Sequence, residues 1–143
     1  MATRAKAHFI EPMLLLRTDR LPDDPTRWAY QLKLDGYRAI AFKTGGKVQL
    51  RSRNNNDFNV RYPVLRGLTK LQDDSVIDGE LVAFDAEGRP SFNTLQNYGS
   101  GTGPVVYYVF DVMMLAGRDL TGDVLDPCHV ARCRGSVDSK LVP

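Results

Sequence analysis

Cysteine is almost absent from this chain of 143 residues, and no apolar run reaches the length of a membrane span. The only two cysteines, Cys128 and Cys133, flank His129 near the end of the chain. Their spacing matches no zinc or redox motif, so we interpret them as reduced, incidental thiols rather than a disulfide framework. The apolar stretch at residues 13–16 is far too short for a signal peptide or a membrane helix. We therefore expect a cytoplasmic protein that has no membrane partner.

Composition sets the size of the fold, and the distribution of charge suggests a partner. With 43% hydrophobic and 25% charged residues, the chain can form one domain with a modest core. The formal net charge is only +2, but residues 43–70, called the basic segment below, hold seven basic residues against one acid, Asp57. Such a segment suits a polyphosphate partner, although a solvated protein surface explains any single one of these residues equally well.

The hexapeptide KLDGYR at residues 33–38 is the most informative stretch. Apolar residues alternate with others from Trp28 to Leu34, which predicts a strand that carries Gln31 and Lys33 on one face. The Asp-Gly pair that follows predicts a hairpin turn into a second strand, residues 37–43. Taken alone, this pattern is typical of a hairpin with a solvated lysine.

Three further motifs follow the hexapeptide in order: SRN at residues 52–54, DGE at 78–80 and YVFD at 108–111. In this order the set resembles the adenylation (nucleotidyltransferase) domain of ATP-dependent DNA ligases, especially the bacterial end-joining type. The resemblance covers roughly residues 11–120. It implies that the chain is an ATP-dependent DNA ligase fragment whose substrates are ATP and nicked or broken double-stranded DNA, with Mg²⁺ as cofactor.

The resemblance makes Lys33 the nucleophile. In this chemistry a lysine amine attacks the α-phosphate of ATP and keeps AMP as a phosphoramide, which then passes to a DNA 5′-phosphate before a 3′-hydroxyl seals the nick. A lysine with an ordinary pKa of about 10.4 is protonated at neutral pH. It must therefore be desolvated or placed beside other cations, and we expect Arg38, Arg53 and the metal on the phosphates to do this.

Five other residues receive roles from the resemblance. Arg38 and Arg53 are expected to bind phosphate or ribose oxygens, since a guanidinium presents a planar fork of donors. Glu80 is assigned the ribose hydroxyl and the metal, Phe110 stacks on adenine, and the backbone carbonyl of Gln31 reads the adenine amino group.

Arg53 and Arg61 are also candidate DNA contacts. For nucleotide binding, the competing interpretations are a surface ion pair for Arg38 and for Arg53, a solvent-facing Glu80 and a core Phe110. For Asp78 and Asp111 we favour structural hydrogen bonds.

Two departures from the family pattern limit the resemblance. Many relatives carry Glu where this chain has Gln31, which places the contribution of that side chain in doubt. Relatives also continue to a Glu-Gly strand, a Lys-x-Lys pair and an OB-fold domain, and none of these is found here. We therefore expect residues 1–120 to form about half of an adenylation domain, which lacks its C-terminal half and the OB-fold. Residues 121–143 are expected to be an irregular tail, and residues 135–143 resemble vector-encoded sequence.

The predicted fold class is α+β: an ATP-grasp-like nucleotidyltransferase domain with an antiparallel sheet and packed helices, incomplete at its C-terminus. Strands are expected at residues 28–34, 37–43, 47–52, 75–84 and 105–115, with a turn at residues 44–46. Helical spacing of apolar residues predicts a helix over residues 60–71 with Asn59 as its N-cap, and one or two helical turns over residues 91–98. A short turn or helix is expected at residues 12–17.

Two other functions are compatible with the hexapeptide. An RNA ligase or an mRNA capping guanylyltransferase fragment shares the lysine motif, although SRN followed by DFN and RYP favours a DNA ligase. From a different class, the chain is also compatible with a non-catalytic remnant that binds nucleotide or DNA.

Overall fold

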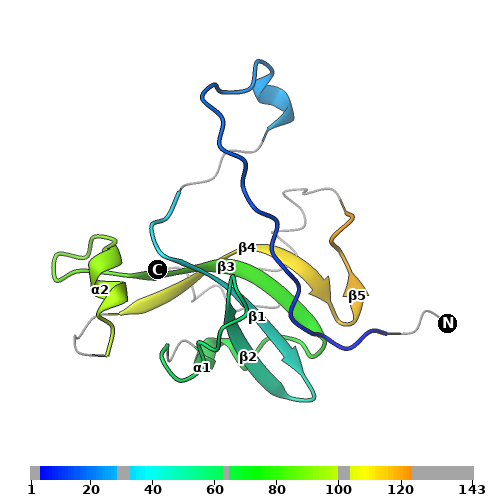
Figure 1. The fold of residues 1–143 in the computed structure, drawn as a ribbon. Coiled ribbons are helices and arrows are strands. Elements are labelled where there is room, and N and C mark those ends of the chain that lie inside the picture. Colours follow the sequence, from blue (N-terminus) through cyan, green and yellow to red (C-terminus); the bar gives the residue numbers. More distant parts are fainter. Residues whose placement is uncertain (1–3, 29–32, 63–64, 100–103, 124–143) are drawn as a thin grey trace.

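A computed structural model describes residues 4–28, 33–62, 65–99 and 104–123 of the chain. Their main feature is a five-stranded antiparallel sheet with the strand order β2-β1-β3-β4-β5 (Figure 1). The strands are β1 (Tyr37–Thr44), β2 (Lys47–Ser52), β3 (Ser75–Ala83), β4 (Val105–Leu115) and β5 (Arg118–Asp119). The predicted antiparallel sheet is therefore confirmed.

The β1–β2 hairpin forms as its sequence predicts. Two glycines connect the strands, and both have positive φ, 56° at Gly45 and 74° at Gly46. A two-residue hairpin loop of this kind matches the twist of the strands but requires positive φ at both positions, which glycine adopts without steric cost. The register then places Ala41 opposite Leu50, so that both side chains enter the core.

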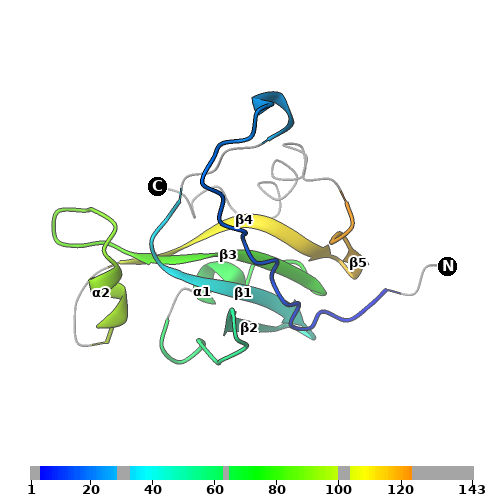
Figure 2. The same cartoon turned by 45° about the horizontal axis from the view of Figure 1, so that its top comes forward.

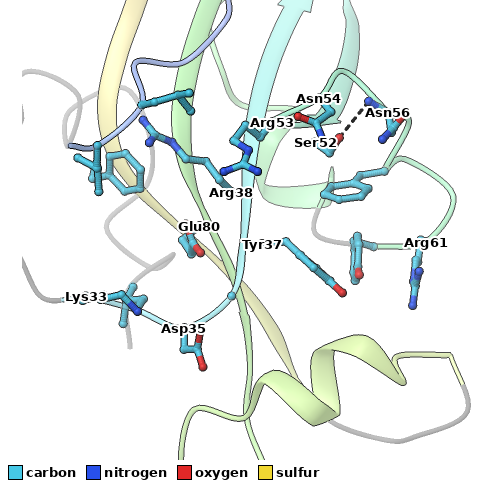
Figure 3. A pocket seen from close by; sticks show the side chains of 17 residues that line it. Lys33, Asp35, Tyr37, Arg38, Ser52, Arg53, Asn54, Asn56, Arg61 and Glu80 are labelled. Carbon is cyan, nitrogen blue, oxygen red and sulfur yellow. Dashed lines mark hydrogen bonds between the residues drawn. The ribbon is translucent and has the colours of Figure 1, made fainter. Parts of the chain in front are cut away.

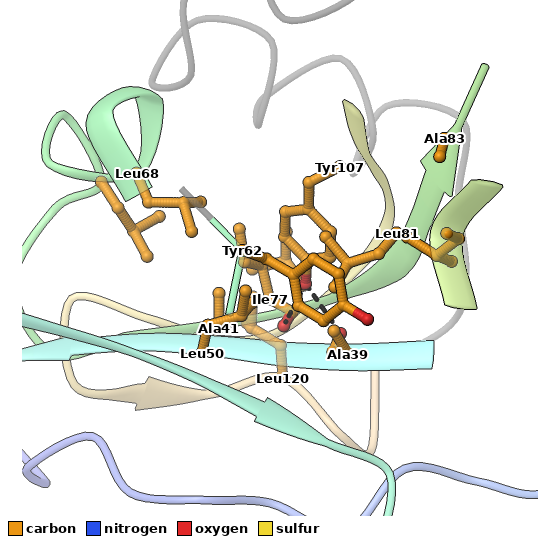
Figure 4. Close-up of a cluster of buried hydrophobic side chains, with 13 residues drawn as sticks. Ala39, Ala41, Leu50, Tyr62, Leu68, Ile77, Leu81, Ala83, Tyr107 and Leu120 are labelled. Carbon is orange, nitrogen blue, oxygen red and sulfur yellow. Dashed lines mark hydrogen bonds between the residues drawn. The ribbon is translucent and has the colours of Figure 1, made fainter. Parts of the chain in front are cut away.

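The central strand β3 depends on a glycine for its contact with β4. A Cβ atom at Gly79 would lie 2.3 Å from the backbone oxygen of Tyr108 and 2.7 Å from the ring of Tyr107. The space that Gly79 leaves lets the buried Tyr107 ring lie across β3, and its hydroxyl donates a hydrogen bond of 2.8 Å to the carbonyl of Ala39 on β1 (Figure 4). One side chain thus ties β4 to β1 across the strand between them.

The two faces of the sheet are covered differently. On one face the main core gathers around Tyr62, Leu81 and Leu95, with the short helices α1 (Leu65–Leu68) and α2 (Phe92–Gln96) packed at its edge. On the other face a smaller cluster, which includes Ile40 and Met113, is covered by the N-terminal segment through Ala7, Phe9 and Ile10. Figure 2 shows this segment, in dark blue, passing over the strands.

Helices contribute less than the sequence predicts. Within the described residues α1 spans four residues rather than the expected 60–71, and residues 12–17 form no helix. The expected N-cap, Asn59, instead accepts a 2.7 Å hydrogen bond from the Leu50 amide, which ties residue 59 to β2, and Val60 is 98% exposed. The prediction for residues 91–98 is confirmed, because Ser91 caps α2 by accepting from the Thr94 amide and Leu95 is buried. The regular secondary structure of the described residues is thus mostly strand, and the expected packing of longer helices is not confirmed.

The predicted strand at residues 28–34 is wrong where it can be judged. Residues 29–32 lie outside the described residues, and Trp28, Lys33 and Leu34 belong to no strand. β1 already pairs with β2 along one edge and with β3 along the other, so no edge is open to a hairpin partner that precedes it. The tail expected after residue 120 is described only as far as residue 123. In the described part of the chain, no helix is long and apolar enough to cross a membrane.

Candidate nucleotide-binding cleft

A cleft of about 1020 Å³ opens where the chain enters β1 (Figure 3). It brings together six of the seven predicted site residues: Lys33, Arg38, Arg53, Arg61, Glu80 and Phe110. The seventh, Gln31, lies outside the described residues. Lys33 stands on the segment that leads into β1, Arg38 on β1, Glu80 on β3 and Phe110 on β4, so neighbouring strands supply the floor of the cleft.

The glycine of the hexapeptide is needed for close approach between two backbones. A Cβ atom at Gly36 would lie only 1.9 Å from the carbonyl oxygen of Leu81 on β3. Because Gly36 has no side chain, the segment that carries Lys33 can lie against β3, and the Gly36 amide donates a hydrogen bond to the carboxylate of Glu80. The Asp-Gly pair therefore positions the lysine segment over Glu80 instead of forming the predicted hairpin.

Arg38 is held by a bidentate ion pair. Its Nε donates to Oδ1 of Asp78 at 3.0 Å, and its Nη2 donates to Oδ2 at 2.6 Å. Asp78 is only 1% exposed. Burial raises the pKa of Asp78, and the hydrogen bonds from Arg38 oppose that rise; the same hydrogen bonds raise the pKa of Arg38. The structural hydrogen bonding favoured for Asp78 is confirmed. Two nitrogens of the Arg38 guanidinium, which was expected to bind a ligand, are thus already bound to Asp78.

Phe110 lies beneath the Arg38 guanidinium. The Cζ atom of Arg38 is 5.2 Å from the centroid of the Phe110 ring, within the range of a cation–π contact. Phe110 is half-buried and lines the cleft together with Lys33 and Glu80. The prediction that these three residues share one pocket is confirmed, whereas their roles stay predictions.

Glu80 is a half-buried carboxylate that faces the cleft from β3, directly across from Arg38 in the strand register. Burial raises its pKa above the ordinary value, and the charge of Arg38 and the Gly36 amide partly oppose that rise. A carboxylate held under such a penalty binds readily to a hydroxyl donor or to a metal cation that offsets it.

Lys33 is exposed, and its side chain makes no hydrogen bond or ion pair with the described residues. The expected effect of Arg38, Arg53 and metal-bound phosphates on Lys33 concerns the bound nucleotide and stays a prediction. Asp35 and Lys33 lie together at one side of the cleft in Figure 3, whereas Arg61 lies at the other. A nucleotide that fills the space between them would itself have to exclude water from the amine.

The arginines at the far side are held by different contacts. Arg53 is exposed and follows β2 in a turn where the Asn56 amide donates to Ser52 Oγ at 3.0 Å. Its own amide donates to the Arg38 carbonyl at 3.2 Å, which fixes the turn to β1. Arg61 is exposed as well, but its Nη2 donates to the carbonyl of Gln96 at 2.5 Å.

Two other members of the basic segment are occupied within the protein. Lys43 Nζ donates to the carbonyls of Thr69 and Leu71, at 2.9 and 3.0 Å, and Arg51 donates to the side chain of Gln49. Neither of them lines the cleft. Among the described side chains of the basic segment, Arg53 and Arg61 line the cleft, so this segment contributes less charge there than the sequence suggests.

One wall of the cleft is aromatic, formed by Tyr37, Phe58 and Tyr62, and was not expected from the sequence. Phe58 meets Tyr62 edge to face with ring centroids 5.1 Å apart, and Tyr37 lies 6.0 Å from Phe58. The signal available in the sequence was the aromatic residue in DFN and in RYP, the two tripeptides that follow SRN. The side chains of Leu14 and Leu15 complete the lining from the N-terminal segment.

Comparison with known proteins gives matches across most of the chain. Residues 12–127 match the family model described as ATP dependent DNA ligase domain. The chain is 43% identical over 99 residues to the multifunctional non-homologous end joining DNA repair protein LigD of Mycobacterium tuberculosis, which covers 68% of this chain and 13% of LigD. It is 33% identical over 141 residues to DNA ligase C1 of Mycolicibacterium smegmatis, which covers 86% of this chain and 39% of that protein.

The fold has similar solved structures too. A structure of mycobacterial DNA ligase D complexed with ATP and MES matches with a TM-score of 0.61 and 35% sequence identity, over 73% of this chain and 36% of that one. The chain thus spans 13% to 39% of the length of these three proteins.

Replacement of Glu80 by Gln is expected to stabilise the fold in a pH-dependent way. Because burial raises the pKa of Glu80 in the folded state, the folded protein binds this proton more tightly than the unfolded chain, and stability falls as pH rises above the ordinary glutamate value. Glu80→Gln removes this loss, so its gain in urea midpoint over the parent should be larger at pH 7 than at pH 4.

The exposed Glu11 supplies the control. Glu11→Gln should leave the urea midpoint nearly unchanged at both values of pH. A Glu80→Gln variant less stable than the parent at pH 7 would show that the contacts of the carboxylate outweigh its burial.

Proposed function

This chain belongs to the family of ATP-dependent DNA ligase domains, and we propose that its cleft binds ATP and presents Lys33 to the α-phosphate. The observation that supports this most directly is the meeting of Lys33, Arg38, Glu80 and Phe110 in one cleft, from three separate stretches of the sequence. The sheet is, in this proposal, the N-terminal part of an ATP-grasp-like nucleotidyltransferase domain that extends to about residue 120.

The proposed reaction is adenylyl transfer to a lysine amine. The neutral Nζ of Lys33 attacks the α-phosphorus, a phosphorus–nitrogen bond forms, and the bond from that phosphorus to the oxygen shared with the β-phosphate breaks. Pyrophosphate leaves with the electron pair of the broken bond, and the amine gives its extra protons to solvent. Lys33 is exposed in the structure. In this proposal the bound nucleotide excludes water from the amine, and this desolvation favours the neutral form.

The residues around Lys33 have distinct tasks in this proposal. Phe110 offers a ring face to adenine, and the Gln31 carbonyl reads the adenine amino group. Arg38 and Arg53 donate to ribose or phosphate oxygens, where fixed cations stabilise the charge that builds up during transfer. Glu80 accepts from a ribose hydroxyl.

The donor set also fits a magnesium ion that arrives with the nucleotide. The described residues hold no cluster of three or more His, Cys, Asp or Glu side chains that could cage a metal. Magnesium commonly uses one or two carboxylates together with substrate phosphates and water. Glu80 lines the cleft and supplies such a carboxylate, whereas Asp78 is occupied by Arg38. When bound, the ion would offset phosphate charge.

Transfer of AMP to a DNA 5′-phosphate and sealing of the nick are proposed for the full-length enzyme. Arg53 and Arg61 are the proposed DNA contacts, since both are exposed in the cleft wall. Sealing would require the parts that relatives supply beyond this stretch, among them the Lys-x-Lys pair and the OB-fold. The matched relatives are DNA ligases, so a capping enzyme or RNA ligase is not favoured.

The nucleophile can be tested by mass spectrometry. After incubation with ATP and magnesium, a lysine adenylate adds about 329 Da, and peptide mapping should place it on Lys33. Lys33→Ala should abolish the added mass. Lys47→Ala is the matched control, because Lys47 is an exposed lysine at the start of β2 that does not line the cleft. Adenylate on another lysine, or adenylate that survives Lys33→Ala, would refute the assignment.

Binding of the chain to duplex DNA should be weak and salt-dependent. Each phosphate contact contributes about 0.9 to the slope of log affinity against log salt, so the double variant Arg53→Ala, Arg61→Ala should flatten that slope by about 2. The control double variant Arg89→Ala, Arg118→Ala removes the same charge from exposed arginines outside the cleft. An equal effect of both double variants on the slope would mean that net charge alone governs binding.

A further inference from the structure

The ion pair between Arg38 and Asp78 joins a residue of the cleft to one that the cleft does not reach. Arg38 lines the cleft, whereas Asp78 is 1% exposed and is not part of its lining. The two residues stand 40 positions apart in the sequence and are brought together because β1 pairs with β3. A group as deeply buried as Asp78 has no direct access to a nucleotide.

The pair uses only one edge of the guanidinium. Nε and Nη2 point at the two carboxylate oxygens, and Nη1 makes no hydrogen bond to the described residues. The side chain of Arg38 is 19% exposed, so a ligand can reach it from the cleft. The Cζ atom of Arg38 also lies over the Phe110 ring, 5.2 Å from its centroid, which further restricts the side chain. The free Nη1 edge is therefore held in one place before any ligand arrives.

We propose that Asp78 is a positioning residue: it never touches the nucleotide, but it holds the Arg38 guanidinium over Phe110 with Nη1 directed to an oxygen of the bound nucleotide. This inference rests on the proposed function of the cleft. A free arginine side chain samples many rotamers, and fixing it upon binding costs affinity. Asp78 removes that cost in advance, because both of its oxygens are already engaged by the same guanidinium.

The sign of the effect separates positioning from simple electrostatics. ATP is a polyanion, so removal of a nearby negative charge should strengthen its binding if charge alone matters. Loss of positioning should weaken it. Asp78→Asn has the same shape but no charge, and its amide nitrogen cannot accept from Arg38. The two explanations thus predict opposite changes for the same variant.

The experiment is a double-mutant cycle on ATP affinity, measured by calorimetry on the 143-residue chain and three variants: Asp78→Asn, Arg38→Gln and the two combined. Loss of one charge-assisted hydrogen bond corresponds to about tenfold weaker binding, which we expect for each single variant. The combined variant should bind no more weakly than Arg38→Gln alone, since Asp78 acts only through Arg38.

Ser75→Ala controls for a general loosening of β3. Ser75 is also fully buried on that strand and accepts a hydrogen bond, from the Ala116 amide, but it does not line the cleft. It should lower the urea midpoint and leave ATP affinity unchanged. If Ser75→Ala weakened ATP binding as much as Asp78→Asn at a similar loss of stability, the effect of Asp78 would be structural and the inference would be overturned.

Some of the remaining outcomes contradict only the role of Asp78, and one also refutes the proposed function. Asp78→Asn that binds ATP as tightly as the parent, or more tightly, contradicts the inference while the proposed function stands. The inference is also contradicted if the combined variant loses ATP affinity by the product of the two single-variant factors, because Asp78 would then act independently of Arg38. A parent chain that does not bind ATP would refute the proposed function itself, and this inference with it.

Discussion

The pairing of β1 along both of its edges is the constraint on which the cleft depends. Strand β2 occupies one edge and β3 the other, so alternate side chains of β1 must point to opposite faces of the sheet. Ala39 and Ala41 therefore enter the main core, whereas Arg38 points into the cleft. A slip of one residue in this register would turn Arg38 toward the main core and Ala39 and Ala41 away from it.

Two glycines make this pairing possible at the point where chemistry is proposed. Gly36 lets the lysine segment approach the backbone of β3, and Gly79 lets the ring of Tyr107 pass over that strand. Both positions belong to motifs identified in the sequence, the hexapeptide and DGE. Lys33 and Arg38 of the hexapeptide and Glu80 of DGE line the cleft, and the glycine of each motif leaves space for a close approach on β3.

The sequence predicts an element well when the residues that determine it are close together in the chain. The β1–β2 turn, β3, β4 and α2 follow from patterns a few residues long, and all four form. The lysine segment was mispredicted as a strand because the second partner of β1 comes more than thirty residues later. The helix over residues 60–71 was overestimated because Asn59 binds back to Leu50 instead of capping it.

The resemblance predicts which residues line the cleft. It does not predict the contacts that hold these residues in place. Neither alternation nor spacing indicated that Asp78 would bind Arg38, or that Lys43 would be occupied by two carbonyls. Such contacts arise only once the strands are paired. The roles of the cleft residues toward ATP remain predictions, since they concern a ligand rather than the fold.

The central claim is that ATP binds where Gly36, Glu80 and Phe110 meet, and amide chemical shifts test it most directly. In a titration of the isotopically labelled chain with ATP and magnesium, we expect the largest changes at these three residues and at Arg53. The turn at Gly45 and Gly46, which lies at the opposite end of β1, should be unchanged. Changes centred on that turn, or an unchanged spectrum at millimolar ATP, would contradict the account.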